Sequence, residues 1–166
     1  MDDILSSKFI FLEMAVMLMN NIEAYWSAFK NKNNITTDKY SAFAFGWPES
    51  MQNELAELVK SGIKTATTSA FELYEPNEEI PLIGEYNIIL DGRGNPVCIT
   101  QTKVVETVPF NLISQEHAFH EGEGDRSYDY WRKVHEDFFN KEFKENKKTF
   151  KLDAPCICEV FELVFK

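Results

Sequence analysis

A lysine followed by a run of hydroxyl side chains, Lys64-Thr65-Ala66-Thr67-Thr68-Ser69, is the first segment whose residue types could do chemistry. A hydroxyl becomes a nucleophile when a neighbouring base removes its proton, and lysine is such a base only where burial lowers its pKa. In a regular strand Lys64 and Thr67 face opposite sides, so they cooperate only if Lys64 belongs to the incoming loop or a bulge intervenes. A threonine-rich edge strand explains the same residues without any chemistry.

A second candidate wall of a site lies in AFHEGEGDRSYDYWRKVHEDFF, residues 118–139. Glu121 and Glu123 alternate there with two glycines. The glycines could hold the loop close to a ligand while one glutamate accepts a proton or orients water. Alternatively, this is an acidic loop whose charge favours the N-terminus of the following helix.

Several polar and aromatic residues are candidates for ligand contacts. Arg126 and Ser127 either bind a phosphate or carbonyl oxygen at a helix N-terminus or simply cap that helix. Trp47 and Trp131 either belong to the core or stack on a base. The predicted ligand-binding set is Thr65, Trp47, Glu123, Arg126, Ser127 and Trp131.

The hydrophobic pattern predicts the elements that must position these residues. Helices are expected over 20–31, from Pro48 to about Gly62, over 110–122 and over 128–143, and strands over 40–45, 64–73, 156–166 and on both sides of a turn at 91–95. Helices and strands do not alternate regularly, which argues against a doubly wound parallel sheet. The sequence predicts a mixed α+β domain around a curved, mostly antiparallel sheet or small barrel.

Charge and length limit the class of partner. A chain of 166 residues corresponds to about one domain, and its net charge of -10 leaves few cations to neutralise phosphates. Long duplex nucleic acid is therefore not an expected partner, whereas a nucleoside or a short single strand is. The oligomeric state is not predicted.

The cysteines and the N-terminal segment indicate in which cellular compartment the protein is expected. Three cysteines form an odd set without a secretory signal, which predicts a reduced, cytoplasmic protein. No second Cys or His pair matches the spacing of Cys156 and Cys158, and no zinc or dinucleotide motif is present, so neither a metal nor a cofactor is expected. Residues 9–19 are apolar, but they are too short and too interrupted by Glu13 for a membrane span. We expect residues 1–18 to be an N-terminal extension and residues 19–166 to form the domain.

The two candidate segments together resemble the ASCH domain family, which has a PUA-like β-barrel fold. The matching stretches are FAFGWPESMQNELAELVKSGIKTATTS (43–69), the acidic segment 118–139 and the closing strand from 156, so the resemblance covers about 19–165. It implies a small, mostly antiparallel PUA-like barrel flanked by helices and an RNA- or nucleoside-related function. Asn53 and Trp47 stand where acidic residues are expected.

The resemblance also implies specific roles. Some small members are similar to amidohydrolases that remove an acyl group from N4 of modified cytidine, and others are linked to RNA cleavage. The lysine, threonine and glutamate of the amidohydrolases match Lys64, Thr67 and Glu121, with Glu123 as the second choice for the glutamate. Thr67 would be the nucleophile, Lys64 its base, and Glu121 would orient or protonate. The alternative is a non-catalytic RNA-binding or regulatory module.

Overall fold

The computed structural model describes the backbone of residues 2–166 and the side chains of residues 12–166. Its elements are α1 (Asp2–Asn33), β1 (Ser41–Phe43), α2 (Glu49–Lys60), β2 (Ala66–Ala70), η1 (Phe71–Leu73), β3 (Tyr86–Leu90), β4 (Pro96–Pro109), η2 (Phe110–Leu112), α3 (Gln115–Glu121), α4 (Tyr128–Glu145) and β5 (Pro155–Phe165). The strands form one sheet in the order β1-β3-β4-β5-β2. Among the strands of the described residues, only β1 and β3 pair in parallel, so the predicted mixed α+β class with a mostly antiparallel sheet is confirmed.

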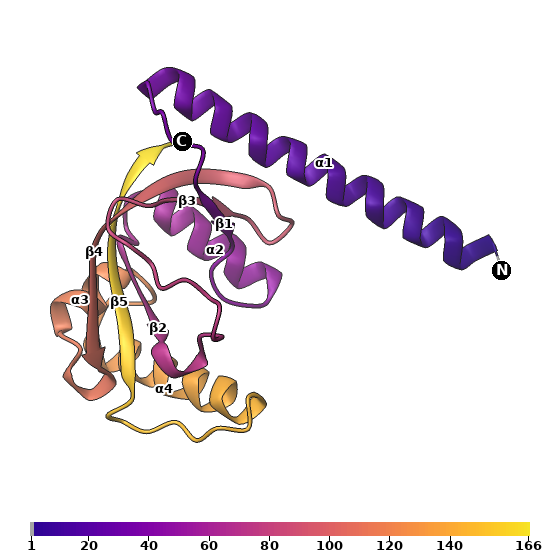
Figure 1. Cartoon of the computed structure of the whole chain (residues 1–166). Coiled ribbons are helices and arrows are strands. Elements are labelled where there is room, and N and C mark those ends of the chain that lie inside the picture. The colour runs from indigo at the N-terminus through magenta and orange to yellow at the C-terminus, as the bar shows by residue number, and fades with distance from the viewer. Residues whose placement is uncertain (1) are drawn as a thin grey trace.

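The sheet curls into an open half-barrel around its two long central strands, β4 and β5 (Figure 1). Their register shifts between Ile99 and Thr100 and between Thr102 and Val104. Irregularities of this kind bend a strand and increase its twist. Among the described strands, β2 pairs with β5 along one edge only, which leaves its other edge open.

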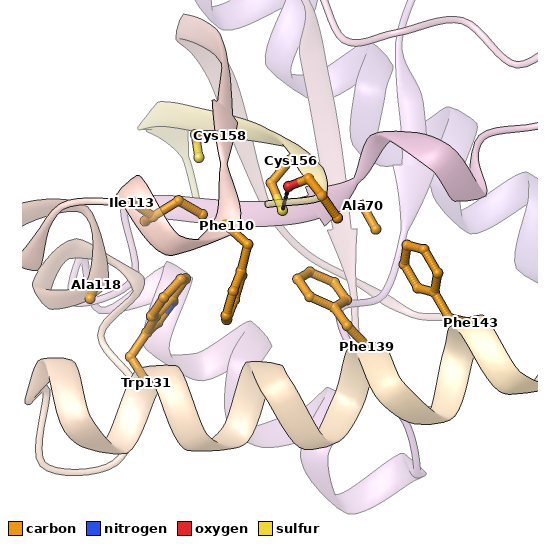
Figure 2. Close-up of a cluster of buried hydrophobic side chains, with 10 residues drawn as sticks. Ala70, Phe110, Ile113, Ala118, Trp131, Phe139, Phe143, Cys156 and Cys158 are labelled. Carbon is orange, nitrogen blue, oxygen red and sulfur yellow. Dashed lines mark hydrogen bonds between the residues drawn. The ribbon is translucent and has the colours of Figure 1, made fainter. Parts of the chain in front are cut away.

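Helices α3 and α4 cover one face of the sheet over an aromatic core (Figure 2). Trp131, His135, Phe139 and Phe143 recur every four residues on α4 and are all buried, because that spacing places them on one helical stripe. Phe110 from η2 stacks on Trp131 with a ring-centre distance of 5.4 Å. The three cysteines are free, buried thiols, and Cys156 and Cys158 belong to this core.

Helix α1 is longer than the predicted helix 20–31, and its N-terminal part extends beyond the sheet (Figure 1). Trp26 and Phe29 anchor it through contacts with Ile88 and Ile99. The expected boundary between residues 18 and 19 falls inside this continuous helix. Residue 1 and the side chains of 1–11 lie outside the described part, and the start of the domain near residue 19 stays a prediction. None of the described helices is long and apolar enough to span a membrane.

Candidate active site

Lys64 lies in the loop between α2 and β2, one of the two arrangements that would let it cooperate with Thr67. The backbone of the α3 end runs alongside this loop, since Thr65 N donates to His120 O at 2.8 Å. Gly122 ends α3 at φ +78°, and a Cβ there would lie 2.8 Å from Ile63 O. Only glycine therefore permits so close an approach, which brings the acidic loop against Lys64.

The Lys64 ammonium and two carboxylates form a buried ion cluster. Lys64 Nζ lies 3.0 Å from Glu121 Oε2 and 3.0 Å from Glu123 Oε1. A third, longer hydrogen bond of 3.4 Å goes to Glu121 O. The Lys64 and Glu121 side chains are 2% and 1% exposed, so this charge pair is almost fully removed from water.

The second oxygen of Glu121 accepts its own hydrogen bonds. Thr68 Oγ1 donates to Glu121 Oε1 at 2.6 Å, and Trp131 Nε1 donates to it at 2.8 Å. His135 Nε2 and His117 Nε2 lie 3.5 Å and 3.6 Å from the same oxygen. Both carboxylate oxygens are thus held in place by protein donors.

These contacts fix the charge states of the cluster. Burial alone would raise the pKa of Glu121, but Lys64, His135 and the hydrogen bonds hold that pKa well below its usual value. Burial alone would lower the pKa of Lys64, but Glu121 and Glu123 hold that pKa above its usual value. Lys64 is therefore an ammonium that already carries its proton. In this state it is a cation and hydrogen-bond donor, whereas the family resemblance implies a base at this position.

The indole donor of Trp131 should contribute measurably to stability. Replacing Trp131 with phenylalanine removes the hydrogen bond to Glu121, and bonds to charged groups contribute about 1.5–3 kcal/mol. Trp26→Phe is a matched control, because the buried Trp26 Nε1 has no partner among the described residues. Urea unfolding should show a larger loss for Trp131→Phe than for Trp26→Phe. Equal losses would mean that the Glu121 contact adds nothing beyond ring packing.

The cluster opens into a cavity of about 670 Å³ beside the free edge of β2. Aromatic rings on its walls come from Phe45, Trp47 and Phe138, and hydroxyl groups come from Thr67, Ser69 and Tyr74. Seven glutamates also line it: Glu78, Glu79, Glu85, Glu121, Glu123, Glu142 and Glu159. Lys64 is the one lysine or arginine among the described lining residues, so the cavity is strongly acidic.

Comparison with known proteins identifies the family. The sequence model of the ASCH domain matches residues 41–165 of this chain. The chain belongs to the ASCH domain family. Among curated proteins, none matches it.

Two solved structures resemble this ASCH domain over most of its length. Protein EF3133 from Enterococcus faecalis V583 is 36% identical with a TM-score of 0.81, and the match covers 89% of this chain and 94% of that one. An ASCH domain from Lactobacillus crispatus JV V101 is 28% identical with a TM-score of 0.77, covering 90% and 94%. The resemblance inferred from the sequence is therefore confirmed at the level of family and fold.

The ASCH cavity gathers five of the predicted site residues: Lys64, Thr67, Glu121, Glu123 and Trp47. Trp47 is 71% exposed and forms part of the rim, with Lys141 Nζ 5.3 Å from its ring centre. Thr67 differs from Lys64 and Glu121 in its surroundings. Since Thr68 donates to Glu121, strand alternation turns the Thr67 side chain away from that hydrogen bond, although both threonines line the cavity at the edge strand β2. No hydrogen bond joins Thr67 to Lys64 or Glu121 among the described contacts.

Four predicted ligand contacts do not line the cavity of this ASCH domain: Thr65, Arg126, Ser127 and Trp131. Thr65 Oγ1 lies 3.1 Å from His120 Nδ1. Arg126 Nε donates to Phe119 O at 3.1 Å, and its guanidinium lies 3.7 Å from the Phe119 ring centre. Ser127 caps α4 by accepting from a backbone N–H. Each therefore has a local structural partner that accounts for its position.

Trp131 packs in the core, which is one of the two alternatives that the sequence left open for this ring. Its side chain is 2% exposed, and its ring stacks with Tyr128, Phe110 and His135. What it supplies to the site is its N–H, through Glu121. The described side chains contain no group of three or more histidine, cysteine, aspartate or glutamate residues placed to hold a metal ion.

Proposed function

We propose that this ASCH domain is an amidohydrolase that binds a nucleoside in its cavity and removes an acyl group from the exocyclic amine of the base, as in N4-acylated cytidine. One observation carries the proposal: Lys64, Thr67 and Glu121 line a single cavity although Lys64 and Glu121 are 57 positions apart. These three residues match the amidohydrolase motif that the sequence resembles.

The size and lining of the cavity support a nucleoside-sized ligand. Pockets for small molecules usually measure about 300–1,000 Å³ and combine apolar walls with a few placed polar groups. The rings of Phe45, Trp47 and Phe138 offer flat surfaces for a base, and aromatic rings stack on any base through its π-face. The hydroxyl of Thr67 has no protein partner among the described contacts, whereas the hydroxyls of Ser69 and Tyr74 hydrogen-bond to each other at 2.8 Å.

The proposed reaction proceeds through an acylated threonine. Thr67 Oγ1 loses its proton to a base and forms a bond to the acyl carbon, while the carbonyl π electrons move to the oxygen. When the carbonyl re-forms, the C–N bond breaks and the amine takes a proton. Water then attacks the ester, which releases the carboxylic acid and returns a proton to Thr67. Water and amide are consumed, and acid and amine are produced.

In this scheme Lys64 stabilises the developing oxyanion, and Glu121 holds Lys64 in place. Fixed cations aimed at developing negative charge are among the largest contributions to catalysis in a water-excluded site. The 3.4 Å bond from Lys64 to Glu121 O is the longest of its three, so a substrate oxygen can replace it at the least cost.

A nucleoside-binding module without catalysis is the second candidate, and one observation favours it. All three hydrogens of the Lys64 ammonium already have acceptors in the protein. An ion cluster whose hydrogen bonds are all satisfied can also form a rigid part of the cavity wall against which a ligand binds. The hydrolase releases its ligand as two products, whereas the binding module releases it chemically unchanged.

The test is a screen of acylated nucleosides and short RNAs, with products separated by chromatography. Release of cytidine and acid from N4-acetylcytidine, at a rate proportional to protein concentration, supports the hydrolase. Saturable binding of the nucleoside without any product supports the binding module. If no compound binds and no compound gives a product, both candidates are overturned.

The acidic lining predicts a preference for ligands without phosphate. We expect kcat/KM for N4-acetylcytidine to exceed that for its 5′-monophosphate roughly tenfold at low salt, because the phosphate meets seven glutamates and one lysine. The preference should shrink as salt screens these charges. The variant Glu78→Gln/Glu79→Gln should reduce it further. Faster turnover of the phosphorylated compound would instead indicate an RNA-directed site.

A further inference from the structure

Thr67, the proposed nucleophile, lies directly opposite Glu159 in the sheet. The two residues are register partners in the antiparallel pair of β2 and β5. Partners of this kind point to the same face with Cβ atoms about 4.5–5.5 Å apart. Both line the cavity, as do Lys64 and Glu121, which cluster around the neighbouring Thr68.

The surroundings of Glu159 leave one of its oxygens available. Thr102 Oγ1 donates to Glu159 Oε2 at 3.4 Å, and Oε1 has no hydrogen-bond partner among the described residues. Its neighbour on the β4 side is Val105, which offers no charge. The charged and titratable groups around it are the carboxylate of Glu85 and the hydroxyl of Tyr74, with Glu78 beyond Tyr74.

The three carboxylates near the reaction therefore differ in what they can do. Both oxygens of Glu121 are occupied by donors, so taking a proton would break several hydrogen bonds. Glu123 is bound by Lys64 on the same side as Glu121. Glu159 alone combines a free oxygen with the strand position opposite Thr67.

We propose that Glu159 is the catalytic base and acid of the hydrolysis, exchanging its proton with Thr67 and with the leaving amine. The proposal rests on the function proposed above. The Glu159 carboxylate takes the Thr67 proton as the Oγ1–acyl bond forms and gives it to the amine nitrogen as the C–N bond breaks. It then takes a proton from the attacking water and returns it to Thr67 Oγ1 as the ester breaks.

The titration of Glu159 suits this exchange. Burial, and then Glu85, raise the pKa of Glu159 to about 7, against the opposing hydrogen bond from Thr102. Proton transfer is most effective when the pKa of the transferring group is near the working pH. The base form exists above the pKa, so kcat/KM should rise with pH through a midpoint near 7.

The experiment compares pH profiles of N4-acetylcytidine hydrolysis for wild type, Glu159→Gln and Glu162→Gln. Glu159→Gln should lower kcat/KM by about 10²–10⁴-fold and flatten the limb near neutral pH. It should still bind the nucleoside, which shows that the site is intact. Glu162→Gln is the matched control, because Glu162 is an exposed residue of β5 paired with Lys103. It should keep the wild-type profile.

A second variant separates a chemical role from a structural one. Burial is the main cause of the raised pKa of Glu159, and the Glu85 charge raises this pKa further. Glu85→Gln removes that charge, so the midpoint of the profile should move part of the way to lower pH. A residue that only supports the fold would not shift this midpoint. If wild type is active and Glu159→Gln keeps its rate and profile, the proton-transfer role is overturned while the hydrolase remains. If wild type turns over no acylated nucleoside, both proposals fall.

Discussion

Replacing Lys64 with methionine lowers the free energy of unfolding by about 3–5 kcal/mol at neutral pH, the usual cost of removing one partner of a buried ion pair. Methionine fills much of the lysine's aliphatic volume, so the loss is chiefly electrostatic. The variant leaves Glu121, which is 1% exposed, and the partly buried Glu123 without their cation. Urea unfolding followed by circular dichroism measures the change.

Lys60→Met is the matched control for this loss. Lys60 lies 3.0 Å from Glu57 on the surface of α2, with side-chain exposures of 44% and 66%. Exposed pairs contribute only about 0–1 kcal/mol. If Lys64→Met and Lys60→Met destabilise the domain equally, Lys64 is not the counter-ion of a buried carboxylate.

The loss should also depend on pH in a defined direction. In wild type the lowered pKa of Glu121 stabilises the fold above the unfolded value of about 4.3. That stabilisation is lost as pH falls toward the folded pKa. In Lys64→Met, burial without a cation raises the pKa of Glu121, so its carboxyl becomes neutral at a higher pH. The stabilities of wild type and variant should therefore converge on acidification.

Thr67→Val should lower kcat/KM for N4-acetylcytidine by at least about 10³-fold, because removing a nucleophile leaves only binding and electrostatic stabilisation. Valine keeps the branched shape and the strand preference of threonine. No described hydrogen bond depends on the Thr67 hydroxyl, so stability should change by less than about 0.5–1 kcal/mol. Affinity for the nucleoside should stay close to that of wild type. Stopped-flow binding and product assays separate these two effects.

Thr107→Val provides the same change at an exposed position of β4 that does not line the cavity. It should leave both affinity and turnover unchanged. A Thr67→Val variant that kept wild-type turnover would assign the nucleophile elsewhere, for example to water, and would remove the acyl-threonine from the mechanism.

The sequence predicted most of the fold and the central pair of the site. Alternation and helical spacing located most elements near their observed bounds, because buried stripes leave a clear periodic signal. The meeting of Lys64 with Glu121 followed from the family resemblance. No local pattern reports that two loops 57 positions apart share one cavity.

Other features depended on tertiary contacts and were missed. Thr68, and not Thr67, donates to Glu121, because β2 begins at Ala66 and its alternation is set by pairing with β5. The ammonium state of Lys64 depends on Glu123 as well as Glu121. The strand register, which places Glu159 opposite Thr67, is a long-range pairing that one sequence does not specify.

The ligand-binding predictions for Arg126, Ser127 and Trp131 stay predictions, and each of these side chains has a structural partner in the fold. Each sits in a motif in which the residue type suits both a ligand contact and local structure. Capping, a cation–π contact and core packing account for these side chains here. Residue type alone does not distinguish a ligand contact from a structural role, because the role depends on whether the side chain faces the cavity in the folded protein.

The most direct test of the central claim is a crystal structure of Thr67→Val with N4-acetylcytidine bound. We expect the base beside Phe45 and Trp47, the acyl carbon next to position 67, and the acyl oxygen about 3 Å from Lys64 Nζ. Density for the nucleoside outside this cavity, or for an acyl group pointing away from Lys64, would contradict the proposed hydrolase site.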